Sequence, residues 1–260
     1  MNVLRSILLT TTIMSIGLSF AQAGVVIGGT RVIFDGNKKE ASISVNNPDN
    51  IPYLIQSWIE TPGDGAGKAP FIITPPLYRL NNGQQNVERI VATGALPQDK
   101  ESLFWLNIKA IPSASQVDNT LQIAIKTRIK LIYRPATMKG ASPEEQADKL
   151  RWQRVGNKIQ VNNPTQHVMN FNEISLSGKR VPDVSYVLPG STATFDLPSG
   201  VTGGPVTFKI INDYGSPGAE HKASLQAGEP TLSGIYDDGN GLYKSTISTV
   251  GIVDNHRALR

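Results

Sequence analysis

A single long β-strand is predicted by the stretch Leu121-Gln122-Ile123-Ala124-Ile125-Lys126-Thr127-Arg128-Ile129-Lys130-Leu131-Ile132-Tyr133-Arg134-Pro135. Its apolar residues fall largely at alternate positions, which places them on one face of a pleated strand. The other face is mainly polar, and Pro135 ends the strand because proline has no N–H to donate. Fifteen residues at about 3.3 Å each would span about 50 Å, whereas most strands have about 5–6 residues. Such a strand need not bury its whole apolar row inside its own domain.

The residues before this strand predict an immunoglobulin-like β-sandwich. Seven or eight strands separated by turns occupy about 110 residues, with no helical period. We expect one continuous strand over Val25–Phe34, and a hairpin in which Leu77–Leu80 pairs with Asn86–Ala92 through the turn Asn81-Asn82-Gly83. The first domain is therefore predicted to cover residues 24–138.

A second, smaller β-domain is predicted over residues 139–223. Pro135–Gly140 has the composition of an elbow between domains, and a short helix should start with Ser142 as N-cap and run to about Trp152. Five further strands follow before residue 223. For the extension, residues 224–260, a mobile tail is favoured over an extra ordered hairpin, because only Ser245–Val253 has a strand-like pattern.

The N-terminus predicts export. Residues 1–23 read as a cleavable signal peptide, with Arg5 as its only charge, an apolar run, and Ala21-Gln22-Ala23 as a small-residue cleavage site. A membrane anchor is the alternative, but the apolar run is short and interrupted. No other segment predicts membrane insertion of the mature chain.

Composition excludes several classes of site. The 260 residues carry a net charge of +4, or +3 after loss of Arg5, and the basic residues are scattered, so no nucleic-acid partner is implied. There is no cysteine, which excludes disulfides, thiol catalysis and thiolate metal sites. The histidines His167, His221 and His256 are widely spaced, so they are read as structural or surface residues. Neither a catalytic residue, a metal site nor a cofactor is expected.

One further segment is Leu96-Pro97-Gln98-Asp99-Lys100-Glu101-Ser102-Leu103-Phe104-Trp105-Leu106-Asn107-Ile108-Lys109-Ala110-Ile111-Pro112. It closely resembles the signature of periplasmic pilus-assembly chaperones of the P-pilus and type 1 pilus family. Four further landmarks follow the family's order: residues 29–34, 56–60, 129–135 and 211–215. The resemblance covers about Gly24 to His221 and implies an all-β fold of two immunoglobulin-like β-sandwich domains in a boomerang arrangement. The short segment Ser113–Asn119 resembles the family's short-loop subclass.

The resemblance implies a function in the chaperone–usher pathway. A chaperone of this family binds pilin or fimbrial subunits in the periplasm by donor-strand complementation and delivers them to an outer-membrane usher, without enzymatic activity. An immunoglobulin-like structural or adhesive cell-surface module is the alternative. The pilus system that is served, and self-capping of the free chaperone as an oligomer, are left open.

The resemblance also implies three groups of site residues. Leu121, Ile123 and Ile125 would form the donated apolar row, against the alternative that all three pack within their own sandwich. Arg31 and Lys130 would anchor the pilin's C-terminal carboxylate, and Glu101, Arg134 and Asp213 would form a salt bridge linking the two domains. The alternative for these charges is separate solvation. Since Lys130 and Ile125 differ in parity, a bulge or marked twist between them would be needed for both to engage one ligand, and the local geometry that joins them is left open.

Overall fold

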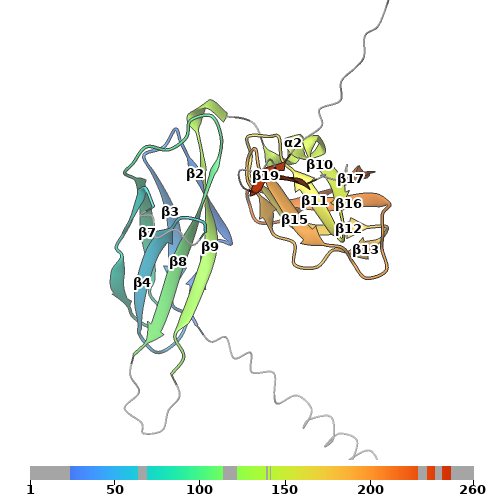
Figure 1. The fold of residues 1–260 in the computed structure, drawn as a ribbon. Coiled ribbons are helices and arrows are strands. Elements are labelled where there is room, and N and C mark those ends of the chain that lie inside the picture. The colour runs from blue at the N-terminus through green and yellow to red at the C-terminus, as the bar shows by residue number, and fades with distance from the viewer. Residues whose placement is uncertain are drawn as a thin grey trace, which may run out of the picture. The chain divides into compact units, whose positions relative to one another are not determined.

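A computed structural model of the chain describes residues 24–63, 69–113, 122–138, 140, 142–227, 233–237 and 242–246, with only the backbone described for Ala227 and the last two ranges (Figure 1). The predicted signal peptide and Leu121 lie outside these residues. The described residues form two compact units. The first contains those up to Pro143 together with Gln166–Val168 and Ile211–Pro217, and the second contains the others. The predicted boundary between residues 138 and 139 stays a prediction.

The first unit is a sandwich of two sheets. One sheet has the order β1 (Val26–Ile27), β3 (Glu40–Asn46), β7 (Gln85–Ala92), β5 (Phe71–Thr74). The other has the order β2 (Arg31–Asp35), β9 (Ile125–Arg134), β8 (Ser102–Pro112), β4 (Tyr53–Glu60), β6 (Leu77–Leu80). β2 and β9 pair in parallel. Inward-facing side chains of both sheets form one buried core, which includes Phe34, Val45, Ile55, Ile90, Leu106 and Leu131.

Two predictions about strand pairing in this unit are wrong. The expected strand Val25–Phe34 breaks into β1 and β2, which belong to different sheets, and Gly28 at the break donates its N–H to Ser44 O at 2.8 Å. The expected hairpin does not form either, because β6 pairs with β4 whereas β7 pairs with β3 and β5. The turn after Leu80 instead crosses between sheets, where the buried amide of Asn47 donates to Leu80 O and Asn81 O.

The long strand is shorter than predicted. β9 begins at Ile125, and residues 122–124 have no regular structure. Its antiparallel neighbour β8 pairs Ala110 with Ile125 and ends two residues later at Pro112. Because Pro112 has no N–H, the ladder between β8 and β9 cannot continue through it. The predicted stop at Pro135 agrees with the structure, in which β9 ends at Arg134.

The second unit begins with α2 (Pro143–Gln146) and the 3-10 turn η2 (Ala147–Lys149), which follow η1 (Ala136–Met138) of the first unit. The helix starts where predicted but ends before Trp152, because residues 151–155 form a strand. The sheet of the second unit has the order β13 (Lys179–Arg180), β12 (Met169–Leu176), β16 (Pro205–Ile211), β17 (Pro217–Ala227), β10 (Arg151–Val155), β11 (Lys158–Asn162), β15 (Thr192–Asp196). A further strand, β14 (Tyr186–Val187), pairs with β12. Trp152, Phe171, Ile174 and Phe208 are among its buried residues.

The C-terminal extension contains strands that the sequence did not predict. β17 extends to Ala227, and β18 (Ser233–Asp237) pairs antiparallel with β19 (Leu242–Thr246). The structure thus contains a hairpin in the extension, and the mobile tail stays a prediction. The sequence between the two strands, Asp238-Gly239-Asn240-Gly241, has the composition of a turn. Within the described ranges, no helix is long and apolar enough to cross a membrane.

Candidate functional site

The first half of β9 is an open edge of its sheet. Ile125–Ile129 pair with β8 on one side, whereas β2 begins to pair on the other side only at Lys130. Among the described residues, no strand pairs with the second side of this half. The N–H and C=O groups along it can therefore accept a strand from another chain.

An apolar row leads onto this edge. Ile123 and Ile125 are 64% and 49% exposed, whereas Ile129, further along the same face of β9, is 8% exposed and belongs to the core of the sandwich. The two described residues of the predicted donor row are therefore not sealed inside their own domain, as the alternative required. Their exposure is what strand donation needs, since the side chains that fill a partner must first be accessible.

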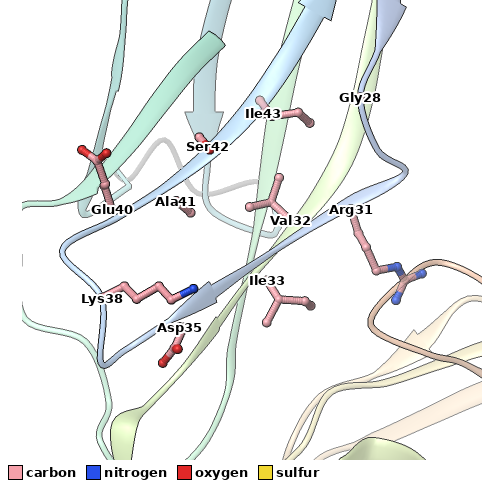
Figure 2. A pocket seen from close by; sticks show the side chains of 10 residues that line it. All are labelled: Gly28, Arg31, Val32, Ile33, Asp35, Lys38, Glu40, Ala41, Ser42 and Ile43. Carbon is pink, nitrogen blue, oxygen red and sulfur yellow. The ribbon is translucent and has the colours of Figure 1, made fainter.

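A pair of cations stands where the open edge ends. Arg31 on β2 and Lys130 on β9 are direct partners in the parallel ladder. The Arg31 Nε is buried and has no hydrogen-bond acceptor within the part of the chain that the structure describes. Arg31 is one of the residues that line a pocket of about 340 Å³ beside β2 and β3, and Figure 2 shows its guanidinium directed away from β3.

Burial weakens the hold of both cations on their protons. It lowers the pKa of Lys130 to about 8, and the adjacent charge of Arg31 contributes to this fall. Burial also lowers the pKa of Arg31, while the negative charge of Asp213 partly offsets the effect. Two partly dehydrated positive charges side by side repel each other, so an anion bound between them would relieve both penalties.

The β8–β9 ladder has no bulge between Ile125 and Lys130. The β8–β9 register is continuous from Ala110–Ile125 to Ser102–Tyr133, so the two side chains lie on opposite faces of the sheet. This does not prevent both from contacting one ligand. A terminal carboxylate belongs to the main chain, and in an added strand it would lie near the plane of the sheet, where a lysine on either face can reach it.

Hydrogen bonds join Glu101, Arg134 and Asp213, which all belong to the first unit, and a link between two domains through them stays a prediction. The guanidinium of Arg134 donates two parallel hydrogen bonds to Asp213, Nη1 to Oδ2 at 2.6 Å and Nη2 to Oδ1 at 2.8 Å, and its Nε donates to Glu101 Oε1 at 2.6 Å. Burial alone would lower the pKa of Arg134, but the two carboxylates raise it. The three charges are therefore not separately solvated.

The chain matches two family models in sequence order. Residues 24–139 match the model described as pili and flagellar-assembly chaperone, PapD N-terminal domain, and residues 145–222 match that described as pili assembly chaperone PapD, C-terminal domain. The chain belongs to the PapD family of pilus-assembly chaperones. Between residues 24 and 222, the two matches leave out residues 140–144.

Similar proteins include two curated chaperones. The chaperone protein LpfB of Salmonella typhimurium is 44% identical over 226 residues, which are 82% of this chain and 96% of LpfB. The chaperone protein FimC of Escherichia coli K12 is 44% identical over 202 residues, covering 75% of this chain and 82% of FimC.

Two solved structures share the fold along almost their full length. The SafB chaperone of Salmonella enterica, solved in complex with the SafA pilin, has a TM-score of 0.73 at 38% identity and covers 80% of this chain and 99% of SafB. The E. coli chaperone DraB has a TM-score of 0.70 at 36% identity and covers 78% of this chain and 97% of DraB.

Sequence reasoning missed two partners of the salt bridge in this chaperone. The side chain of Glu101 is buried. Its Oε2 accepts a hydrogen bond from the backbone N–H of Val168 at 2.8 Å, and its Oε1 lies 3.2 Å from His167 Nδ1. The sequence predicts His167 as a structural or surface residue without this partner. Glu101 and Val168 are 67 positions apart, and no local sequence pattern joins residues so distant.

The other two histidines lie elsewhere. The Nδ1 atom of His221 is 2.8 Å from Asp148 Oδ1, and His256 is outside the described residues. No group of three or more His, Asp or Glu in the described part could hold a metal ion.

The outer face of the β9 sheet carries stacked aromatic and basic side chains, which the sequence did not reveal. Arg128 lies 4.3 Å and Lys130 Nζ 5.8 Å from the ring centre of Trp105, and Lys126 Nζ lies 5.8 Å from that of Trp58. Each contact can contribute about 0.5–1 kcal/mol when exposed. These contacts hold the basic row of β9 against β8 and β4.

Proposed function

We propose that this chaperone acts in the periplasm, where it binds pilin subunits by lending them the open edge of β9 and delivers them to an outer-membrane usher. One observation carries the proposal: the open edge and its exposed apolar row run directly into the Arg31–Lys130 pair. An incoming strand would meet free backbone groups along the edge and a cationic site at its end. The SafB chaperone, which shares this fold, was solved in complex with a pilin.

Strand addition supplies both polar and apolar contacts. The free N–H and C=O groups of Ile125–Ile129 would pair with a pilin strand, and Ile123 and Ile125 would fill its groove. Full burial of an isoleucine side chain contributes about 1.5–3 kcal/mol before the cost of association. Leu121 is proposed as the third member of the row. Binding alone would provide the free energy, with no catalytic step and no cofactor.

Arg31 and Lys130 are proposed to bind the C-terminal carboxylate of the pilin. Charge-assisted hydrogen bonds to a carboxylate are among the stronger polar contacts. Here the negative charge of the carboxylate would also offset the repulsion between the two positive charges. Because the terminus is one fixed point of the pilin strand, holding it determines which pilin residues face Ile123 and Ile125. The two cations would thus set the register of the added strand.

The Glu101–Arg134–Asp213 salt bridge is proposed to position this site. Arg134 and Lys130 lie on the same strand, and Asp213 acts electrostatically on Arg31. By holding Asp213, Arg134 keeps segment Ile211–Pro217 packed with the first unit. The role is architectural, because all three charges are already paired with one another.

Coexpression with pilin subunits from the same genome tests the proposal. Pilin should be soluble and copurify with the wild-type chaperone, and Lys130→Ala should lose the pilin while the chaperone still folds. Lys126→Ala is the matched control, since it removes an exposed lysine from the same face of β9. Copurification of pilin at the wild-type level with Lys130→Ala would contradict the anchor role. N-terminal sequencing of the exported protein should give a start near Gly24.

The alternative of a structural or adhesive surface module is not favoured. Both β-domains match chaperone family models, and no observation on the described residues points to an adhesive role.

A further inference from the structure

The core of the first unit, the sandwich that contains β9, includes a carboxyl group that the proposed function does not use. Glu88 on β7 points inward and is 0% exposed. Its Oε1 accepts hydrogen bonds from the hydroxyl of Ser57 at 2.7 Å and from that of Tyr78 at 2.9 Å. Ser57 lies on β4 and Tyr78 on β6, so this cluster joins the two sheets of the sandwich.

The second carboxyl oxygen of Glu88 differs from the first. Glu88 Oε2 is buried and makes no hydrogen bond within the described part of the chain. An ionised carboxylate in an apolar interior is costly unless it is paired and fully hydrogen-bonded. Here one oxygen is satisfied and the other is not, which favours the neutral acid.

No cation faces Glu88 from the strands around it. Its neighbour across the β3–β7 ladder is Ile43, and the inward side chains of β3, β4, β5 and β6 are apolar apart from Ser57 and two tyrosines, Tyr53 and Tyr78. Tyr53 bonds to Asp49 instead. The charged residues on these strands and on β7 lie at least partly in solvent: Glu40, Glu60, Arg79 and Arg89.

Desolvation therefore decides the protonation of this group. Burial raises the pKa of the Glu88 carboxyl, and the hydrogen bonds from Ser57 and Tyr78 oppose the rise only in part. Burial and the neighbouring carboxyl together raise the pKa of Tyr78, so its hydroxyl keeps its proton as well.

We propose that Glu88 is a buried acid switch: the folded chaperone holds it neutral in acidic surroundings, and loss of its proton as the pH rises loosens the packing between the two sheets. The unfolded chain releases this proton at lower pH than the folded chain does. Over that interval the folded state binds more protons, so stability falls as the pH rises. Glu88 by itself therefore stabilises the sandwich that carries β9 most at a pH below the pKa of the unfolded chain, and this contribution is lost as the pH rises through the pKa of the folded chain.

The first test follows the Glu88 carboxyl directly by ¹³C NMR of the full chain without pilin, with the signal assigned from backbone connectivities. Its titration midpoint should lie above the value of about 4.3 for a free glutamate side chain. Tyr78→Phe should move the midpoint higher still, because it removes a hydrogen bond that favours the ionised form. A wild-type midpoint at or below the free value would overturn the proposal.

The second test compares stability across pH. Between the free value and the Glu88 midpoint, the unfolding equilibrium constant of the wild type should increase relative to Glu88→Gln by up to tenfold per pH unit. Glu40→Gln, which removes an exposed carboxylate from β3, is the control and should not reproduce this trend. A ratio of wild type to Glu88→Gln that does not change with pH would refute the switch. Neither test involves pilin, so failure here leaves the proposed strand donation standing.

Discussion

Lys130 should reduce the stability of the free chaperone while serving its ligand. The side chain lies between Arg31 on β2 and Trp105 on β8, partly withdrawn from solvent and next to a like charge. Lys130→Met keeps a long flexible side chain and removes the charge, so we expect a chaperone that is more stable but does not retain pilin.

The magnitude follows from the lysine's pKa. A fall from 10.5 to about 8 corresponds to about 3 kcal/mol against the charged form. The ammonium keeps part of its surface in water, where screening weakens the penalty, and the variant loses a cation–π contact with Trp105. We therefore expect Lys130→Met to be about 1–2 kcal/mol more stable than the wild type at pH 7.

Urea unfolding at several pH values measures this difference, and the sign of its pH dependence is fixed. Below pH 8 Lys130 is charged in both states and the penalty is complete. As the pH rises from about 8 toward 10.5, the folded protein releases the proton of Lys130 before the unfolded chain does. The free energy of unfolding of the wild type therefore rises toward that of the variant, and the difference between the two decreases.

A matched variant separates this effect from general changes on the strand. Lys126→Met removes an exposed lysine from the same face of β9, where it makes a similar contact with Trp58. It should change stability by no more than about 0.5 kcal/mol. The reasoning is refuted if Lys130→Met is less stable than the wild type at pH 7, or if its gain is the same at pH 7 and pH 10.

Three further outcomes are expected. Ile125→Asp places a charge on the open edge and should abolish copurification with pilin, while the unfolding midpoint of the chaperone changes little because this side chain is 49% exposed; retention of pilin would count against strand donation. Pilin affinity, measured by titration calorimetry, should be constant below pH 8 and fall by up to tenfold per pH unit above it as Lys130 loses its proton, and a flat profile up to pH 10 would exclude the anchor. Gly36→Ala should lower stability by about 1–3 kcal/mol in thermal unfolding, because the added carbon would lie 2.8 Å from Arg134 O and Ala136 N; an unchanged melting temperature would show that the backbone yields there.

The extended β-structure of this chaperone could be predicted where the pattern is local. Leu77–Leu80 is a strand with the bounds that alternation and the following turn residues predict. The start of the helix at Pro143 also followed from its neighbours alone. Alternation and capping depend on residues a few positions apart, so they survive without knowledge of the fold.

Partners far apart in the sequence could be expected only through the family resemblance. Arg134 and Asp213 are 79 residues apart, and no spacing rule joins them. The positions of Arg31 and Lys130 were also expected on this basis, and the structure shows that they are ladder partners. His167 and Glu88 escaped notice because nothing in their immediate surroundings marks them as buried next to charged or polar partners.

The sequence by itself determined that this chain is all-β, that it holds two domains, and that residues 123–134 alternate between an apolar and a basic face. Only the tertiary structure decided which side of β9 is covered. β2 pairs from Lys130 onward and leaves Ile125–Ile129 open, and β1, β6 and β7 join sheets that local pattern did not predict. The reason is physical: alternation fixes the faces of a strand, whereas its edges are set by backbone hydrogen bonds to distant segments, which side-chain patterns do not encode.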